Sequence, residues 1–124
     1  MKTINTTHAP EPIGPYSQAI EHNGLLYLSG QIALNPVTGF LEDKDIRKET
    51  TQVMENIKAV LHAAGSGLEN VIKVSIFLMD MKHFDVVNDV YGCFFDKHFP
   101  ARETVQVAGL PKGVNVEMSV IAGA

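Results

Sequence analysis

The sequence predicts an α+β fold: one domain, residues 1–124, with a single mixed β-sheet of about six strands and two helices packed on one face. Two segments carry apolar residues at helical spacing, and several shorter segments alternate apolar and polar residues as half-buried strands do. These segments follow the order strand-strand-strand-helix-strand-helix-strand-strand. A chain of this length can bury a core without disulfide bonds, and it has one cysteine.

Strong turn signals organise the N-terminal part of the chain. Asn23-Gly24 separates the runs Ser17–His22 and Leu25–Ser29, and Asn-Gly favours a type I′ turn because both central residues need a positive φ. We therefore expect a β-hairpin here. Upstream, Thr3–Thr7 predicts a short strand, and three prolines within His8–Pro15 predict a stiff loop.

Two helices are predicted, one before and one after a central strand. Asp43 or Asp45 can cap the first helix, and Gly65 ends it. The second helix is predicted over Lys82–His98, because the proline that follows cannot continue it. The residues of the first helix expected to face the core are Ile46, Val53, Met54, Ile57, Val60, Leu61 and Ala64.

The central strand is predicted over Val71–Met79, with an apolar face made of Ile72, Val74, Ile76 and Leu78. Two helices can cover only one face of the sheet. The other face mixes charged, polar and aromatic residues, which is too apolar for bulk water and too polar for a core. This pattern favours burial against other subunits, with wet clefts between them.

Residues 99–121 contain two alternating runs around a Gly-Leu-Pro-Lys-Gly break, which predicts two strands joined as a hairpin. The loop length leaves the register open. Pairing about the proline puts Arg102 on the face of Met118. A one-residue slip instead puts Arg102 and Thr104 on the face of Glu117, because side chains alternate with period two.

Arg102 and Glu117 are the charged residues that these runs make conspicuous. A carboxylate among valines is costly unless it is paired or used, and a guanidinium can hold a carboxylate through two parallel hydrogen bonds. From spacing alone, a structural Arg102–Glu117 pair is favoured over a functional site.

Composition excludes several classes of function. The net charge of −4 and the scattered basic residues argue against tight nucleic-acid binding, which needs clustered Lys and Arg. No apolar run approaches the roughly 20 residues that span a bilayer, and no apolar signal core follows the N-terminus, so we expect a cytoplasmic protein. The five histidines show no metal-ligand spacing.

Short motifs occur in order along nearly the whole chain: Ile13–Ala19, Ser29–Ile32, Asn88, Pro100–Arg102 and Val116–Met118. Together they resemble the reactive intermediate (imine) deaminase family, also called the RidA or YjgF family. The resemblance implies that residues 1–124 form one imine deaminase-like domain with a chorismate-mutase-like fold. It also implies a homotrimer with sites at the subunit interfaces.

The resemblance further implies an activity. Family members hydrolyse reactive 2-imino acids and 2-enamino acids, such as 2-iminopropanoate, 2-iminobutanoate and 2-aminoacrylate, to 2-keto acids and ammonia. Arg102 would clamp the substrate carboxylate and Glu117 would position the water, with no metal or other cofactor. The implied substrate-binding residues are Tyr16, Ser29, Gly30, Asn88 and Thr104.

Two departures from the family pattern bear on activity. Thr104 stands where many members have cysteine, and Glu103 stands where a small residue usually follows the signature arginine. Glu103 either points away from Arg102 along the strand or weakens carboxylate binding by like-charge repulsion. Two other hypotheses remain: a non-catalytic trimer that senses a small carboxylate, and a ribonuclease or translation inhibitor, against which the acidic balance counts.

Overall fold

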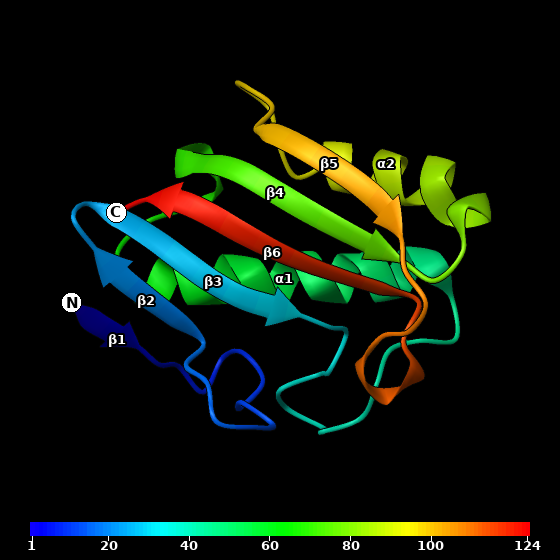
Figure 1. Ribbon diagram of the computed structural model, residues 1–124, viewed down its shortest axis with the longest axis horizontal. Coiled ribbons are helices and arrows are strands. Elements are labelled where there is room, and N and C mark those ends of the chain that lie inside the picture. Colours follow the sequence, from blue (N-terminus) through cyan, green and yellow to red (C-terminus); the bar gives the residue numbers. More distant parts are fainter.

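The computed structural model describes all 124 residues as one six-stranded sheet with two helices on one of its faces (Figure 1). The strands are β1 (Lys2–Ile4), β2 (Ala19–His22), β3 (Leu25–Gln31), β4 (Val71–Leu78), β5 (Ala101–Gln106) and β6 (Val116–Gly123), and the helices are α1 (Ile46–Ala63) and α2 (Phe84–Gly92). The spatial order of the strands is β1-β2-β3-β6-β4-β5. The predicted fold class is confirmed. Neither helix combines the length and apolar character needed to cross a bilayer.

The first hairpin has the predicted turn. β2 and β3 pair antiparallel up to His22 opposite Leu25. Asn23 and Gly24 between them have φ values of 52° and 80°, as a type I′ turn requires.

The predicted hairpin of residues 99–121 is wrong, although both strands exist. β5 pairs parallel with β4, and α2 is the crossover connection that such a pair needs. β6 pairs antiparallel with β4 on one side and with β3 on the other, so β4 lies between β5 and β6 (Figure 1). Alternation within two neighbouring runs reveals strands but not their partners, since a third strand can lie between them.

The helix boundaries follow local chemistry. The Asp45 carboxylate caps α1 by accepting hydrogen bonds from the backbone N–H groups of Arg47 and Lys48. Gly65, with φ of 77°, turns the chain out of the helix. α2 is shorter than predicted: it ends at Gly92, and the next residues form tighter turns, with Phe95 N–H donating to the Gly92 carbonyl.

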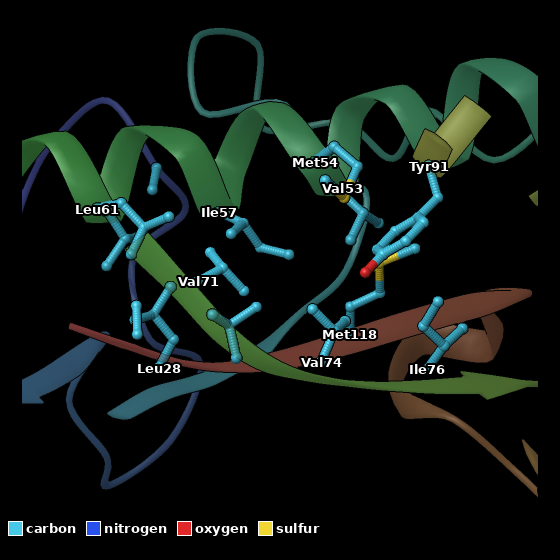
Figure 2. Packing of buried hydrophobic residues seen from close by; sticks show 14 of the residues in the cluster. Leu28, Val53, Met54, Ile57, Leu61, Val71, Val74, Ile76, Tyr91 and Met118 are labelled. Atoms are coloured by element: carbon cyan, nitrogen blue, oxygen red, sulfur yellow. The ribbon is translucent and has the colours of Figure 1, made fainter. Parts of the chain in front are cut away.

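The core lies between the helices and the sheet (Figure 2). Met54 and Ile57 of α1 lie over the sheet, and Tyr91 extends from α2 toward Met118 of β6. The prediction for Ile72 is wrong: a bulge between Val71 and Lys73 shifts the alternation, so that Val71 is buried and Ile72 is exposed. The core residues, as the structure has them, include Leu26, Leu28, Val53, Val60, Leu61, Val74, Ile76, Leu78, Val87, Val116 and Val120.

One buried carboxylate connects the helix layer to the start of β6. Glu49 of α1 is fully buried and accepts hydrogen bonds from Asn115 N–H at 2.7 Å, from the Asn115 side-chain amide at 2.8 Å and from Val116 N–H at 3.1 Å. These donors satisfy the buried charge. Glu49 therefore fixes the backbone immediately before Glu117.

Candidate active site

Glu117 lies on the face of the sheet that the helices leave open. Its neighbours Val116 and Met118 are fully buried on the helix side, so the period-two alternation of β6 turns the Glu117 carboxylate the other way. Gly30, at the irregular end of β3, lies against it. A Cβ atom at Gly30 would lie 2.9 Å from both Cδ and Oε2 of Glu117, which is closer than such atoms approach.

The Glu117 carboxylate is half-buried and has no partner of opposite charge. The three ion pairs of the chain involve other residues. Burial raises the pKa of Glu117 above its usual range, because desolvation disfavours the charged form. A raised pKa makes a carboxylate a better proton acceptor than an exposed one.

A small cavity of about 40 Å³ adjoins Glu117 at the N-terminal loop. Two of the predicted substrate-binding residues, Tyr16 and Gly30, line it. The Tyr16 hydroxyl accepts a hydrogen bond from Ile13 N–H at 3.2 Å, which closes the loop and leaves the hydroxyl proton free. The residues lining this cavity are Pro10, Glu11, Ile13, Tyr16, Gln18, Gly30, Gln31, Ile32, Leu34, Pro111 and Glu117.

Ser29 does not line this cavity. Its hydroxyl donates a hydrogen bond to the Ser17 carbonyl at 2.5 Å, so it fastens the loop that carries Tyr16 to the end of β3. Of the predicted site residues, Ser29 and Tyr16 thus have side chains that are hydrogen-bonded within the chain.

Arg102 lies on the opposite, helix-covered side of the sheet. It is level with the buried Val74 of β4, and its guanidinium lies 5.0 Å from the ring centroid of Tyr91 and 5.8 Å from that of Phe84. These aromatic faces favour a cation and hold it in place. Arg102 and Asn88 both line an open cavity of about 300 Å³. Its lining residues are Asn88, Tyr91, Gly92, Phe99, Pro100 and Arg102.

Two buried hydroxyl groups near Arg102 have no hydrogen-bond partner. They are Thr104 Oγ1, two residues farther along the same strand face, and the hydroxyl of Tyr91. Buried polar atoms are nearly always paired, so unpaired ones call for an explanation, such as a ligand. Thr104, one of the predicted substrate-binding residues, thus has a buried hydroxyl group that no group of the chain satisfies.

Within one chain, Arg102 and Glu117 lie on opposite faces of the sheet. The register that put Arg102 and Thr104 on the face of Glu117 is wrong, and so is the structural ion pair between Arg102 and Glu117. Arg102 lies on the same face as Met118, which is what the other register predicted, but the two strands do not pair with each other. They are related through β4, whose Val74 is opposite Arg102 and whose Ile76 is opposite Met118. The predicted residues thus divide into two groups: Tyr16, Ser29 and Gly30 lie on the side of Glu117, and Asn88 and Thr104 lie on the side of Arg102.

Glu103 points away from Arg102. Its carboxylate accepts a hydrogen bond from the Ser75 hydroxyl and pairs with Lys73 at 2.9 Å on the open face. The Ser75 hydrogen bond, followed by the Lys73 interaction, lowers the pKa of Glu103. Of the two predicted effects of Glu103, the change to the opposite face is the one that the structure has.

Sequence reasoning did not single out Phe84 or Tyr91 as site residues. The aromatic pair follows from helical spacing on α2 combined with the parallel pairing of β4 and β5, which no local pattern indicates. No group of three or more His, Cys, Asp or Glu side chains is arranged to hold a metal ion.

Comparison with known proteins identifies the family to which the chain belongs. The sequence model of the Endoribonuclease L-PSP family matches residues 6–124. The chain belongs to this family, known also as the RidA or YjgF family. Family members of known structure share the six-stranded sheet and two helices described here.

Three RidA-family relatives illustrate the range of names. A Lactococcus lactis protein named as a regulator, AldR, is 52% identical over 98% of this chain and 97% of its own length. The 2-iminobutanoate/2-iminopropanoate deaminase of Mus musculus is 43% identical over 98% of this chain and 90% of its own. The crystal structure of E. coli TdcF with bound serine is 39% identical, with a TM-score of 0.95 over 100% of this chain and 99% of that one.

Proposed function

We propose that the protein is an enzyme that hydrolyses reactive 2-imino acids, such as 2-iminopropanoate and 2-iminobutanoate, to 2-keto acids and ammonia. One observation carries the proposal: the chain holds an unpaired guanidinium in an aromatic frame and an unpaired, desolvated carboxylate beside a water-sized cavity. The first suits a substrate carboxylate, and the second suits proton transfer. The names of the mammalian relatives support the same reaction.

The two halves come together, we infer, between subunits of a homotrimer. One copy supplies Arg102 and the next supplies Glu117, since a single chain keeps them on opposite faces of its sheet. The open face also carries exposed Tyr27 and Val105, apolar surface that a second copy would cover. The serine in the related TdcF structure supports a site for a small carboxylate.

The proposed reaction then needs only a few side chains and one water molecule. Arg102 binds the substrate carboxylate through two parallel hydrogen bonds, and Thr104 and Asn88 contact the rest of the molecule. A water oxygen forms a bond to the imine carbon, the π electrons of the C=N bond move to nitrogen, and Glu117 accepts the water proton. Glu117 returns this proton to nitrogen, which gives a carbinolamine. Glu117 then takes the hydroxyl proton and passes it to the nitrogen, the electrons of the C–N bond leave with ammonia, and the oxygen becomes the keto oxygen.

The test is the release of ammonia and pyruvate from 2-iminopropanoate generated in place by an amino-acid oxidase. We expect acceleration over spontaneous hydrolysis, and its loss in Arg102→Ala. Lys97→Ala, which removes an exposed positive charge outside the Arg102 cavity, is the control and keeps its activity. An unaccelerated reaction with folded, oligomeric protein contradicts the proposal.

A non-catalytic sensor of small carboxylates is the second candidate, and the regulator name of AldR favours it. Arg102 serves both functions, but Glu117 separates them. In the enzyme, Glu117→Gln abolishes turnover while the affinity for keto acids survives. In a sensor, keto acids bind and the wild-type protein turns nothing over.

A further inference from the structure

The face that α2 turns toward Arg102 carries two aromatic rings. Phe84 and Tyr91 stand at positions i and i+7 of α2, two helical turns apart, so they lie on one face of the helix and about 10 Å apart along its axis. The Arg102 guanidinium lies 5.8 Å from the Phe84 ring centroid and 5.0 Å from the Tyr91 ring centroid. It therefore lies between the two rings, which together we call the aromatic bracket.

No carboxylate of the chain pairs with this guanidinium. The three ion pairs of the chain involve other residues, and Asp89, which also lies on α2, pairs with Arg47 of α1 at 2.7 Å. A carboxylate partner would occupy N–H donors and compensate the charge. A ring attracts a cation through its face and accepts none of the hydrogen bonds in the guanidinium plane. The donors and the positive charge of Arg102 thus stay available for a ligand.

The aromatic bracket is fixed by the core. Tyr91 is 4% exposed, and its ring packs against that of Phe95 at a centroid distance of 4.9 Å. Figure 2 shows Tyr91 reaching from α2 into the core. Phe84 is partly buried and packs against the same core. Rings held in this way fix the guanidinium before a ligand arrives, so less side-chain entropy is lost when a carboxylate binds.

The ring of Tyr91 and its hydroxyl group can be separated. The hydroxyl oxygen is closed off from solvent and has no hydrogen-bond partner in the chain, whereas the ring lies beside the Arg102 guanidinium. Phenylalanine at this position would keep the ring and remove an unpaired buried hydroxyl, which is a change that favours stability.

We propose that Phe84 and Tyr91 are positioning residues, which hold the Arg102 guanidinium unpaired and oriented for the substrate carboxylate. The inference rests on the proposed function and deepens it, since it names what preorganises the Arg102 half of the site. The rings act through Arg102 and need not contact the substrate. The carboxylate does not change during hydrolysis, so the bracket stabilises bound substrate and transition state alike. Its loss should therefore raise KM and leave kcat nearly unchanged.

The test compares removal of a ring with its conservation. In Tyr91→Leu and in Phe84→Leu, we expect the KM for 2-iminopropanoate and the dissociation constant for pyruvate to rise about 3- to 30-fold, the range of a cation–π contact. The kcat value should stay within about threefold of the wild type. Tyr91→Phe and Phe84→Tyr keep the rings and should recover a KM within about twofold of the wild type.

A matched control separates this role from the packing of α2. Val87, on the same helix, is 1% exposed and lies outside the aromatic bracket. Val87→Ala loosens the core but leaves both rings beside Arg102, so KM should stay unchanged at a temperature where the protein is folded. If Tyr91→Leu does not fold, the half-buried Phe84 carries the test through Phe84→Leu and Phe84→Tyr.

Three results would overturn the inference. The first is an unchanged KM in both leucine variants. The second is an equal rise of KM in Tyr91→Phe, which would mean that the hydroxyl and not the ring serves the ligand. The third is an equal rise in Val87→Ala, which would assign the effect to the packing of α2.

The two proposals fail separately. Ring-dependent binding of pyruvate to a wild-type protein that hydrolyses no imine overturns the deaminase and leaves the aromatic bracket in place. An active enzyme whose KM is indifferent to both rings overturns the bracket alone.

Discussion

The carboxylate of Glu117 occupies the space that any side chain at Gly30 would need. A Cβ atom there would lie 2.9 Å from Cδ and Oε2 of Glu117. The glycine thus lets a half-buried carboxylate lie directly against the end of β3. Backbone approach, and not chain flexibility, is the reason for glycine at this position, since Gly30 does not have a positive φ.

Gly30→Ala is expected to displace the Glu117 carboxylate and lower kcat about 10- to 100-fold, because small misplacements at a reacting centre are costly. Steady-state kinetics with 2-iminopropanoate measure the effect. Gly109→Ala is the matched control, since a Cβ at Gly109 meets no atom within 4 Å. Equal losses in both variants would contradict the account.

Glu117→Gln is expected to stabilise the protein at pH 7. The pKa of Glu117 is raised in the folded state, so its ionisation costs folding free energy as the pH rises through and above its usual pKa. At pH values below that range the carboxyl is protonated in both states, and the difference from glutamine should vanish. Urea denaturation at pH 3 and pH 7, at one protein concentration, measures this.

Glu103→Gln should show the opposite sign. Its pKa is lowered by Ser75 and Lys73, so the ionised form favours folding above the usual pKa, and this contribution is lost as the pH falls. If both variants changed stability in the same direction at pH 7, the assigned environments of the two carboxylates would be wrong.

Thr104→Val is expected to separate stability from binding. Valine removes a buried hydroxyl that has no partner in the free chain, so the free energy of unfolding should stay unchanged or rise by about 1 kcal/mol. The affinity for pyruvate should fall at least threefold if the hydroxyl contacts the ligand. Calorimetry of folding and of pyruvate binding measures both quantities, and unchanged affinity would remove Thr104 from the site.

Glu49→Gln is expected to destabilise the protein by about 2–3 kcal/mol, because the new amide donor faces the N–H groups of Asn115 and Val116. Thermal denaturation measures the loss. Glu55→Gln, on the exposed face of the same helix, is the control and should stay within about 0.5 kcal/mol of the wild type. Comparable shifts would show that Glu49 is not the connection between α1 and β6.

Local chemistry made much of the fold predictable. The Asn23-Gly24 turn, the Asp45 cap and the Gly65 stop each depend on neighbouring residues, and each lies where the sequence indicates. The pairing of β5 and β6 depends instead on where β4 goes, which no local pattern records. The bulge after Val71 likewise reversed the exposure of Ile72, because one extra residue is invisible to alternation.

The candidate site was predictable only as far as motifs name single residues. They pointed to Arg102 and Glu117 but not to their opposite faces, which follow from the insertion of β4. The sequence did not single out Glu49, because only the fold brings Asn115 to it.

The central claim is that one subunit supplies Arg102 and another supplies Glu117. Arg102→Ala and Glu117→Gln, each inactive alone, are mixed in equal amounts, unfolded and refolded together, and assayed with 2-iminopropanoate. Random assembly of a cyclic oligomer gives intact Arg102–Glu117 pairs at about one quarter of the interfaces, so about one quarter of the wild-type activity should return. No activity in a mixture shown to contain mixed oligomers would contradict the account.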